Sequence, residues 1–385
     1  MVLIHEVKPG LRARTVESEG GLLHLREAWD SLNARCCDGT VFSTWEWCCT
    51  VRKLYGSTSQ VFVIVVEDGS DVVGIAPLVI DRKGLLRAVR FMGAQSPGLS
   101  VSDYCSFVIA PGREETALRM FLEALLERSR EWDVLDLQEV PADSCLMASW
   151  LDEVDRRALH FSAERLNTSY PVPLPDTWQS YLERLSPNTR SELERKTRKL
   201  TREHNVQFER VGEAAQLSDR MNTLFALHTE RWTSRGLPGI FTNERLRPFH
   251  LEVASRFLEK GWLDLTIITA DGEAIGAIYN FEYRDTTCYY ISGFRSTKEW
   301  SRYSLGSILL GNSIKRAIDK GVKVFDLLRG NDPYKSRFDP QQKTNYRLIV
   351  SKTRSTHGLY LEVTKLRGKL KALTGSLRSI GHKVR

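Results

Sequence analysis

Two stretches of this chain read VFVIVVEDGSDVVGIAPLVI (Val61–Ile80) and LDLTIITADGEAIGAIYNFEY (Leu263–Tyr283). Each consists of an apolar run, an Asp-Gly pair, and a second apolar run that is entered through a Gly. Asp-Gly between β-branched runs is the strongest short hairpin signal, because the turn needs a positive φ that Gly adopts without steric cost. Each stretch therefore predicts a β-hairpin.

The similarity between the two stretches continues downstream. Each predicted hairpin is followed by an apolar segment (Arg90–Met92 or Tyr289–Phe294), then by a helical pattern and a short strand that carries an Asp. These closing strands are VLDLQEV at Val134–Val140 and VFDLLRG at Val324–Gly330. Because the repeat spans roughly half of the chain, it indicates two similar domains rather than a solenoid.

The composition agrees with folded domains in a reducing compartment. The chain has 385 residues, of which 42% are apolar, and this length suits about two to three domains of roughly 150 residues. The seven cysteines have no framework spacing, and CxxC and HExxH motifs are absent, which argues against disulfides and against a metal site. Since neither a signal peptide nor an apolar run of roughly 18 residues is found, we expect a cytoplasmic protein.

The net charge of +7 is concentrated in two segments, Arg184–Arg202 and the tail Lys365–Arg385. A basic surface attracts phosphorylated ligands, nucleic acid or anionic lipid without selecting one of them, and a solvated helix face explains it equally well. In the tail, apolar residues alternate at spacings of four and three from Leu359 to Ile380. This pattern predicts a basic amphipathic helix that docks on the body of the protein or contacts an anionic membrane.

A proline-rich segment, Asn167–Pro175 (NTSYPVPLP), is the predicted domain boundary, because its prolines keep the chain extended and remove backbone donors. The predicted domains are an N-terminal domain at residues 1–166, a C-terminal domain at residues 167–357, and the tail at residues 358–385. Periodic apolar residues and capping signals predict helices at His24–Asn33, Phe42–Tyr55, Arg113–Arg130, Ser144–Arg157, Trp178–Leu185, Ala214–Ser234, Arg245–Lys260 and Ser304–Lys320, and a basic helix that begins at Ser186-Pro187.

The second repeat, with RYSLGS (Arg302–Ser307) at its strand-to-helix turn, resembles the acyl-CoA-binding half of the GNAT acyltransferase fold. In that family the diphosphate of the donor rests on unpaired N–H groups at a helix N-terminus, where the helix dipole favours an anion. Of the family's Gln/Arg-x-x-Gly-x-Gly/Ala pattern, only Gly306 matches a glycine. The resemblance implies a donor site made of Ile291, Gly293, Arg302, Ser304, Leu305, Gly306 and Ser307, in which the strand Ile291–Phe294 polarises the donor carbonyl.

The corresponding helix of the first repeat opens with PGREE (Pro111–Glu115). Its two carboxylates favour the start of a helix, but they would repel a bound diphosphate. We therefore expect the second repeat to bind the donor, and the first repeat to serve as a scaffold or to bind the acceptor.

Five further motifs resemble the FemAB-like, CelD-type acetyltransferases, which are tandem-GNAT proteins. The motifs are FSTWEW at Phe42–Trp47, SDY at Ser102–Tyr104, HTERW at His228–Trp232, ISGF at Ile291–Phe294 and DLLRGNDPYK at Asp326–Lys335. Members of this group are often encoded near envelope-polysaccharide genes, and the related FemAB enzymes transfer amino acids from aminoacyl-tRNA to peptidoglycan precursors. The candidate acceptor-binding residues are Trp45, Tyr104, Arg231, Trp232, Arg329, Tyr334 and Lys335.

Several of these residues have a chemical rationale of their own. Arg329, Tyr334 and Lys335 follow a strand end, where ligands collect in open α/β sheets, and we expect the two cations, Arg329 and Lys335, to bind an anion. Asp103 could reach a substrate as a general base from the rim of its Gly/Ser loop, or it could cap the amides of that loop.

His228, Arg231 and Trp232 share one helix face at spacings of three and four. That face could line a cleft, with His228 as a base, or His228 could be an interior residue. Asp136 and Asp326 recur in both repeats, which favours a structural role for them.

Together these patterns predict an α/β (α+β) fold of two tandem GNAT-like domains, each with a mixed sheet flanked by helices. The predicted activity is transfer of an acyl group from acyl-CoA, with acetyl-CoA as the first candidate, to an amine or hydroxyl of a small-molecule or envelope-precursor acceptor. No metal and no covalent intermediate are required. Two alternatives stay open: aminoacyl transfer from tRNA, and a non-catalytic binding component of an envelope-synthesis complex.

Overall fold

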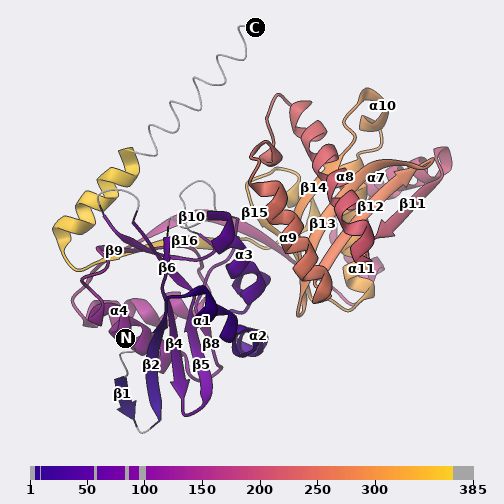
Figure 1. Cartoon of the computed structure of the whole chain (residues 1–385). Coiled ribbons are helices and arrows are strands. Elements are labelled where there is room, and N and C mark those ends of the chain that lie inside the picture. Colours follow the sequence, from indigo (N-terminus) through magenta and orange to yellow (C-terminus); the bar gives the residue numbers. More distant parts are fainter. Residues whose placement is uncertain (1–4, 9, 56–58, 83–85, 95–100, 367–385) are drawn as a thin grey trace. The chain divides into compact units, whose positions relative to one another are not determined.

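The computed structural model describes residues 5–8, 10–55, 59–82, 86–94 and 101–366 (Figure 1). It contains two compact units. Unit 1 consists of Met1–Gly39, Tyr55–Leu166 and Tyr346–Arg385, and unit 2 consists of Thr40–Leu54 and Asn167–Asn345. This division differs from the predicted boundary after residue 166 in two places. Residues 40–54 pack in unit 2, and residues 346–357 pack in unit 1. Whether residues 1–166, 167–357 and 358–385 act as functional domains stays a prediction.

Unit 2 is built on a mixed sheet with the strand order β11-β12-β13-β14-β15-β10 (Figure 1). Adjacent strands are antiparallel except β14 and β15, which run parallel. The strands are β10 (His160–Pro173), β11 (Val206–Arg210), β12 (Leu263–Ala270), β13 (Glu273–Tyr283), β14 (Thr286–Phe294) and β15 (Val324–Arg329).

The predicted hairpin of unit 2 is confirmed as β12 and β13. Asp271 and Gly272 form its two-residue loop, and both have positive φ (52° and 87°), as a type I′ turn requires. On its other edge β13 pairs with β14, where Tyr290 is an extra residue between Tyr289 and Ile291, so β14 contains a β-bulge.

The parallel strands β14 and β15 diverge. Their pairing covers only Thr286–Cys288 of β14 against Val324–Asp326 of β15, although β14 continues to Phe294. From residue 289 to Phe294, the edge of β14 that faces β15 is therefore not paired with it.

Helices cover both faces of this sheet. A side chain at Gly293 would collide with the backbone of His228 in α8 (Ala214–Thr233), whereas one at Gly276 would touch Leu309 of α11 (Leu305–Asp319). Gly293 lies opposite Ala277, and because neighbouring strand residues face opposite ways, α8 and α11 pack on opposite faces. The other helices of unit 2 are α6 (Trp178–Arg184), α7 (Pro187–Glu203), α9 (Leu246–Glu259) and α10 (Lys298–Ser301).

An N-terminal helix, α3 (Trp45–Tyr55), completes unit 2. Its Trp47 is fully buried and makes edge-on or tilted ring contacts with Phe249 and Phe257 of α9 and with Phe281 and Tyr290 of the sheet. Aromatic rings in such contacts each bury a large apolar area, so α3 is part of the hydrophobic core of unit 2.

Unit 1 contains two sheets because a proline interrupts its second hairpin strand. The hairpin predicted at Val61–Ile80 is confirmed, but Pro77 divides its second half into β5 (Asp71–Ala76) and β6 (Leu78–Asp81). Proline cannot donate a ladder hydrogen bond, and β5 and β6 pair in different sheets. One sheet has the order β1-β2-β4-β5-β8, and the other is the part β16-β9-β7-β6-β3 of a longer sheet.

The remaining elements of unit 1 include strands at residues 5–8, 11–16 and 343–351 that the sequence analysis did not predict. The strands are β1 (His5–Lys8), β2 (Leu11–Val16), β3 (Ser59–Val61), β4 (Val63–Asp68), β7 (Ala88–Phe91), β8 (Val108–Ile109), β9 (Val134–Pro141) and β16 (Lys343–Ser351). The helices are α1 (Glu19–His24), α2 (Arg26–Arg35), α4 (Glu114–Glu127) and α5 (Leu151–Arg156).

Asp136, which lies in the closing strand of the first repeat, sits in a buried ion network of unit 1. Its carboxylate is 2.8 Å from Arg90 and 2.7 Å from Arg347, and it accepts a hydrogen bond of 2.7 Å from Tyr360. The carboxylate is fully buried, which opposes ionisation, yet Arg90 and Arg347 hold its pKa below the usual range. This is the structural role expected for Asp136.

The C-terminal tail is described only in part. Residues 354–366 are helical, whereas residues 367–385, which hold most of the predicted basic helix, lie outside the described residues. Among the helices that are described, none is both long and apolar enough to cross a membrane.

Candidate active site

A pocket of about 390 Å³ lies beside the N-terminus of α11 in unit 2. The end of α8, the strand β14, the segment after it, and the first turn of α11 form most of its wall. Six of the predicted site residues line it: Arg231, Ser304, Leu305, Gly306, Ser307 and Tyr334.

The first turn of α11 presents backbone donors to this pocket. The N–H groups of Leu305 and Gly306 have no hydrogen-bond partner among the described residues, whereas that of Ser307 donates to the carbonyl of Ser304 at 2.8 Å. Ser304 precedes the helix in the left-handed region (φ 57°) and does not cap it with its side chain. Free N–H groups and the helix dipole together favour an anion here.

The space beside Gly306 is restricted. A side chain at this position would begin 2.9 Å from the ring of Phe294, which also lines the pocket. Glycine therefore allows the helix start to approach the end of β14 closely, and this explains the need for a glycine at this turn.

Three arginines give the pocket a positive potential. Arg231 donates to the hydroxyl of Ser292 at 2.9 Å and lies 4.5 Å from the ring centre of Phe294, while its buried Nε has no partner in the described part of the chain. Arg235 and Arg295 also line the pocket.

Glu230 orients the third arginine without lining the pocket itself. It pairs with Arg295 at 3.0 Å and accepts the N–H of Ser296 at 3.1 Å. No carboxylate is among the residues described as lining this pocket. The arrangement thus favours a negatively charged ligand.

A chain of hydroxyl groups leads from Arg231 across the pocket. Tyr289 and Ser292 are hydrogen-bonded at 2.6 Å, and Tyr334 forms a hydrogen bond with Tyr289. Burial, followed by the neighbouring Tyr289, raises the pKa of Tyr334 well above its usual range. Tyr334 therefore keeps its proton at neutral pH.

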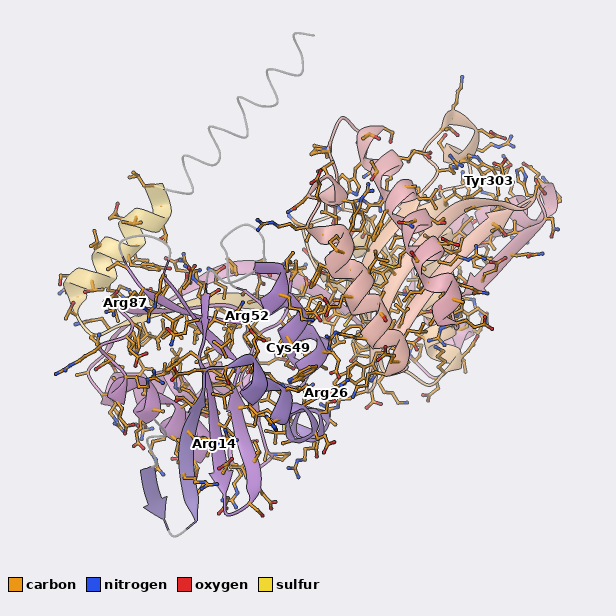
Figure 2. All side chains as sticks on the ribbon, viewed as in Figure 1. Arg14, Arg26, Cys49, Arg52, Arg87 and Tyr303 are labelled. Atoms are coloured by element: carbon orange, nitrogen blue, oxygen red, sulfur yellow. The ribbon has the colours of Figure 1, made fainter. Side chains whose placement is uncertain are left out.

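Other predicted donor residues lie outside the pocket lining. Ile291 is buried within β14, and Gly293 allows close packing against α8. Arg302 donates to the hydroxyl of Tyr303 at 2.5 Å and lies 3.4 Å from Glu203, with about half of its side chain exposed. The position of Arg302 in unit 2 can be found from its neighbour Tyr303, which is labelled in Figure 2.

The side chain of Lys335 has a local structural task. It is 3% exposed, and its ammonium donates to the carbonyls of Leu328 (3.1 Å) and Arg329 (2.6 Å). Leu328 has a positive φ of 57°, so Lys335 holds the turn after β15 in place. Neither Lys335 nor Arg329 lines the pocket, and anion binding by this pair stays a prediction.

His228 is an interior residue of unit 2. Its ring packs 4.9 Å from that of Phe241, and its Nδ1 atom has no hydrogen-bond partner within the described chain. Burial and the nearby Arg231 lower its pKa to about 4, so it is neutral at pH 7. Trp232 contacts Arg231 and Arg235 through its ring, and the largely buried Trp45 packs under Arg256 of α9.

Asp103 and Tyr104 belong to unit 1 and are buried there. The residues that line the pocket of unit 2 do not include them. Their roles in general base catalysis and acceptor binding stay predictions.

Unit 1 has a pocket of its own, of about 250 Å³, between β2 and α4. Its wall carries Glu17, Glu123, Glu127 and Glu131, with Arg14 and Arg128. Arg128 is bound by Glu17 and by Glu131. This excess of carboxylates disfavours a phosphorylated donor, which agrees with the expectation that the second repeat, and not the first, binds the donor.

The sequence analysis missed several residues of the unit 2 pocket. These are Ser234, Arg235, Tyr289, Phe294, Arg295, Ser296, Trp300, Ser301 and Phe338. One signal was available. Arg231, Ser234 and Arg235 are spaced by three and four residues, so they project from the same side of the chain at the end of α8. Within the described residues, no cluster of His, Cys, Asp and Glu could hold a metal ion.

Comparison with known proteins identifies a domain that includes most of this pocket. Residues 187–336 match the family model of the Acetyltransferase (GNAT) domain, and this segment contains every residue of the pocket except Phe338. A search of curated proteins gave no match.

Three solved structures are similar over most of their length. The crystal structure of FemX has a TM-score of 0.62 at 11% identity, covering 84% of this chain and 95% of FemX. A conserved protein of unknown function from Bacteroides thetaiotaomicron has a TM-score of 0.57 at 11% identity (91% and 100% covered), and L-PGS from Bacillus licheniformis has 0.52 at 14% (91% and 97%). At these identities the similarity concerns the fold, and the predicted α/β fold of GNAT-like domains is confirmed.

Proposed function

We propose that this GNAT-type acyltransferase takes an acyl group from acyl-CoA and transfers it to an amine or hydroxyl of a small-molecule or envelope-related acceptor. One observation carries the proposal: the free N–H groups of Leu305 and Gly306 lie at a pocket that also contains Arg231, Arg235 and Arg295. A diphosphate fits such a site, because both the helix start and the guanidinium groups favour an anion.

The diverging strands suggest where the thioester lies. With the diphosphate at the start of α11, the acyl end of the donor would extend along β14, where its pairing with β15 has stopped after Cys288. Backbone N–H groups at an unpaired strand edge can donate to the thioester oxygen as negative charge develops on it. This is the site at which we place the reacting carbonyl.

The reaction then needs one proton acceptor and one proton donor. The acceptor nitrogen or oxygen attacks the thioester carbon, its proton passes to a base, and the C–S bond breaks. We assign protonation of the leaving thiolate to Tyr334, which keeps its proton and is hydrogen-bonded to Tyr289. The base is not assigned from the pocket, because His228 is neutral but interior and does not line it, and Asp103 belongs to unit 1; their roles as bases stay predictions.

An aminoacyl-tRNA donor is the second candidate, and the surface of α7 favours it. Arg195, Arg198 and Arg202 are exposed on this helix, and Lys196 of the same helix donates to the carbonyl of Arg302, directly before α11. A basic helix beside the donor pocket suits a nucleic-acid backbone. The domain match, which names acetyltransferases, favours acyl-CoA.

Calorimetry and turnover with the two donor classes test the proposal. We expect acetyl-CoA or a longer acyl-CoA to bind, and Arg231→Ala and Arg295→Ala each to weaken binding by roughly tenfold or more, the usual effect of losing a hydrogen bond to a charged group. Arg256→Ala, on α9 and outside the pocket lining, is the matched control. Binding of aminoacyl-tRNA alone would select the second candidate, and binding without turnover of either would indicate a non-catalytic protein.

A further inference from the structure

The loop between α8 and α9 exposes two aliphatic side chains. Leu237 is 49% exposed and Ile240 is 42% exposed, and both belong to the small set of large apolar residues left at the surface of the described chain. Neither lines the donor pocket. Exposed aliphatic groups on a defined surface element are typical of contact sites for partners or membranes.

The same loop is held in a fixed conformation. The N–H of Leu237 donates to the carbonyl of Trp232 at 2.9 Å, and Gly239, with φ 70°, lies against the ring of His228. Phe241 is buried between Phe225 (4.4 Å between ring centres) and His228. Because Phe241 anchors the loop, Leu237 and Ile240 are presented at the surface without a large loss of entropy on binding.

The segment that carries these two side chains is basic. Arg235, Arg245 and Arg247 are exposed, and none of them forms an ion pair with a described residue. Glu244 is the single acidic residue of the segment 234–247. The surface thus combines aliphatic groups with an excess of two positive charges.

We propose that residues 235–247 dock on a membrane surface that contains anionic lipid. Leu237 and Ile240 would enter the boundary of the acyl chains, while Arg245 and Arg247 contact the lipid phosphates and bury their apolar stems. Two aliphatic side chains are too few for a stable protein interface, which needs about 800 Å² on each partner. An anionic bilayer, in contrast, supplies both the apolar layer and the charge that this loop complements.

Docking has a consequence for the acceptor. Ser234 and Arg235 line the donor pocket and directly precede the loop, so the docked protein would hold the pocket beside the lipid headgroups. If the proposed acyl transfer is correct, an acceptor whose amine or hydroxyl belongs to an amphiphile in the membrane is then within reach. This second step rests on the proposed function, whereas docking itself does not.

Sedimentation of the full chain with sucrose-loaded vesicles tests the docking. We expect the wild type to bind vesicles of phosphatidylglycerol and phosphatidylcholine more strongly than vesicles of phosphatidylcholine alone, and high salt to weaken the binding. The double variant Leu237→Asp/Ile240→Asp should lower the partition coefficient by about tenfold or more, because two carboxylates would face an anionic surface. Replacing Arg245 and Arg247 by Ala should cost about fivefold for each charge.

The matched control is the double variant Leu23→Asp/Leu359→Asp, which places the same two charges on leucines that are exposed outside the loop. It should bind vesicles like the wild type. Because all variants keep residues 367–385, differences among them report on the loop and not on the basic tail. Equal sedimentation of the wild type and the double variant, or no binding of the wild type to anionic vesicles, would overturn the proposal. Donor binding measured in parallel keeps a failure of docking distinct from a failure of the proposed function.

Discussion

The indole ring of Trp47 lies edge-on to the ring of Tyr290, with 5.6 Å between their centres. Tyr290 is the extra residue of the bulge in β14, and Trp47 comes from α3, an N-terminal helix that packs within unit 2. Bulges beside a site re-aim the strand that carries them. The strand that faces the donor pocket is therefore supported by a helix from the other end of the chain.

Replacing Trp47 by Ala should lower the free energy of unfolding by about 3–5 kcal/mol, because a fully buried aromatic side chain leaves a cavity among the rings of Phe42, Phe249, Phe257, Phe281 and Tyr290. Urea unfolding measures this change. Leu23→Ala, at a leucine that is 60% exposed, should alter stability by less than about 0.5 kcal/mol. Equal stability of the two variants would contradict the assignment of α3 to the core of unit 2.

Substitutions at Gly306 separate charge from size at the proposed diphosphate site. Gly306→Gln introduces the volume of a long side chain against Phe294, and Gly306→Glu adds a negative charge of nearly the same shape. At about 4 Å from the anion this charge is worth roughly 1–4 kcal/mol, so calorimetry should show donor binding at least about fivefold weaker for Glu than for Gln.

The control for this experiment is Gly212→Glu, since Gly212 is in open space in the same unit. Gly112, at the start of the corresponding helix in unit 1, is a poorer control than the sequence suggests. Its φ of 77° strains any other residue, so Gly112→Glu loses stability for a reason unrelated to donor binding. Similar donor affinity of Gly306→Glu and Gly306→Gln would place the diphosphate elsewhere.

Tyr334→Phe removes the proposed proton donor and keeps the ring. Turnover should fall by roughly 10²–10⁴ with little change in KM, since general acid catalysis contributes in this range. Steady-state kinetics with a thioester whose thiol is more acidic gives the decisive comparison, because a better leaving group needs less protonation. If the loss is the same for both thioesters, Tyr334 acts in binding or packing and not as the acid.

Local signals in the sequence predicted much of unit 2. Three of these signals each act within a few residues of the element they define. They are the turn at Asp271-Gly272, the N-cap at Ser186, and the glycine that follows α11 at Gly321. The hydroxyl of Ser186 accepts the N–H of Thr189 at 3.3 Å. The same reasoning placed the start of α11 and hence one wall of the pocket. Such features need no knowledge of distant contacts.

Features that depend on distant contacts were not predictable in this way. The buried face of α3 is equally apolar whichever unit it packs against, so the sequence does not reveal that Trp47 meets Tyr290. Arg235 and Arg295 look like ordinary solvated cations until Glu230 and the helix start are brought beside them. Pro77 was visible as a strand breaker, but the separation of β5 and β6 into two sheets follows from their partners.

Two buried histidines should make the protein sensitive to mild acid. Burial, followed by Arg231, lowers the pKa of His228 to about 4, and burial, followed by His228, lowers the pKa of His250 to about 3. The unfolded chain takes up these protons near pH 6.5, whereas the folded chain stays neutral to well below pH 5. Stability is thus unaffected above about pH 7 and falls as the pH drops from 6.5, by up to about 1.4 kcal/mol per pH unit for each histidine.

Urea unfolding between pH 7.5 and pH 5 measures this effect before buried carboxylates such as Asp136 are protonated. We expect the wild type to lose roughly 3–4 kcal/mol over this range. His250→Phe, which keeps a ring among Phe241, Phe249 and Tyr290, should lose about half as much, because one of the two proton-linked groups is gone. His24→Gln, at an exposed histidine of α1, should follow the wild type. If His250→Phe shows the same dependence on pH as the wild type, His250 is protonated in the folded state and the buried pair is not the source of the acid sensitivity.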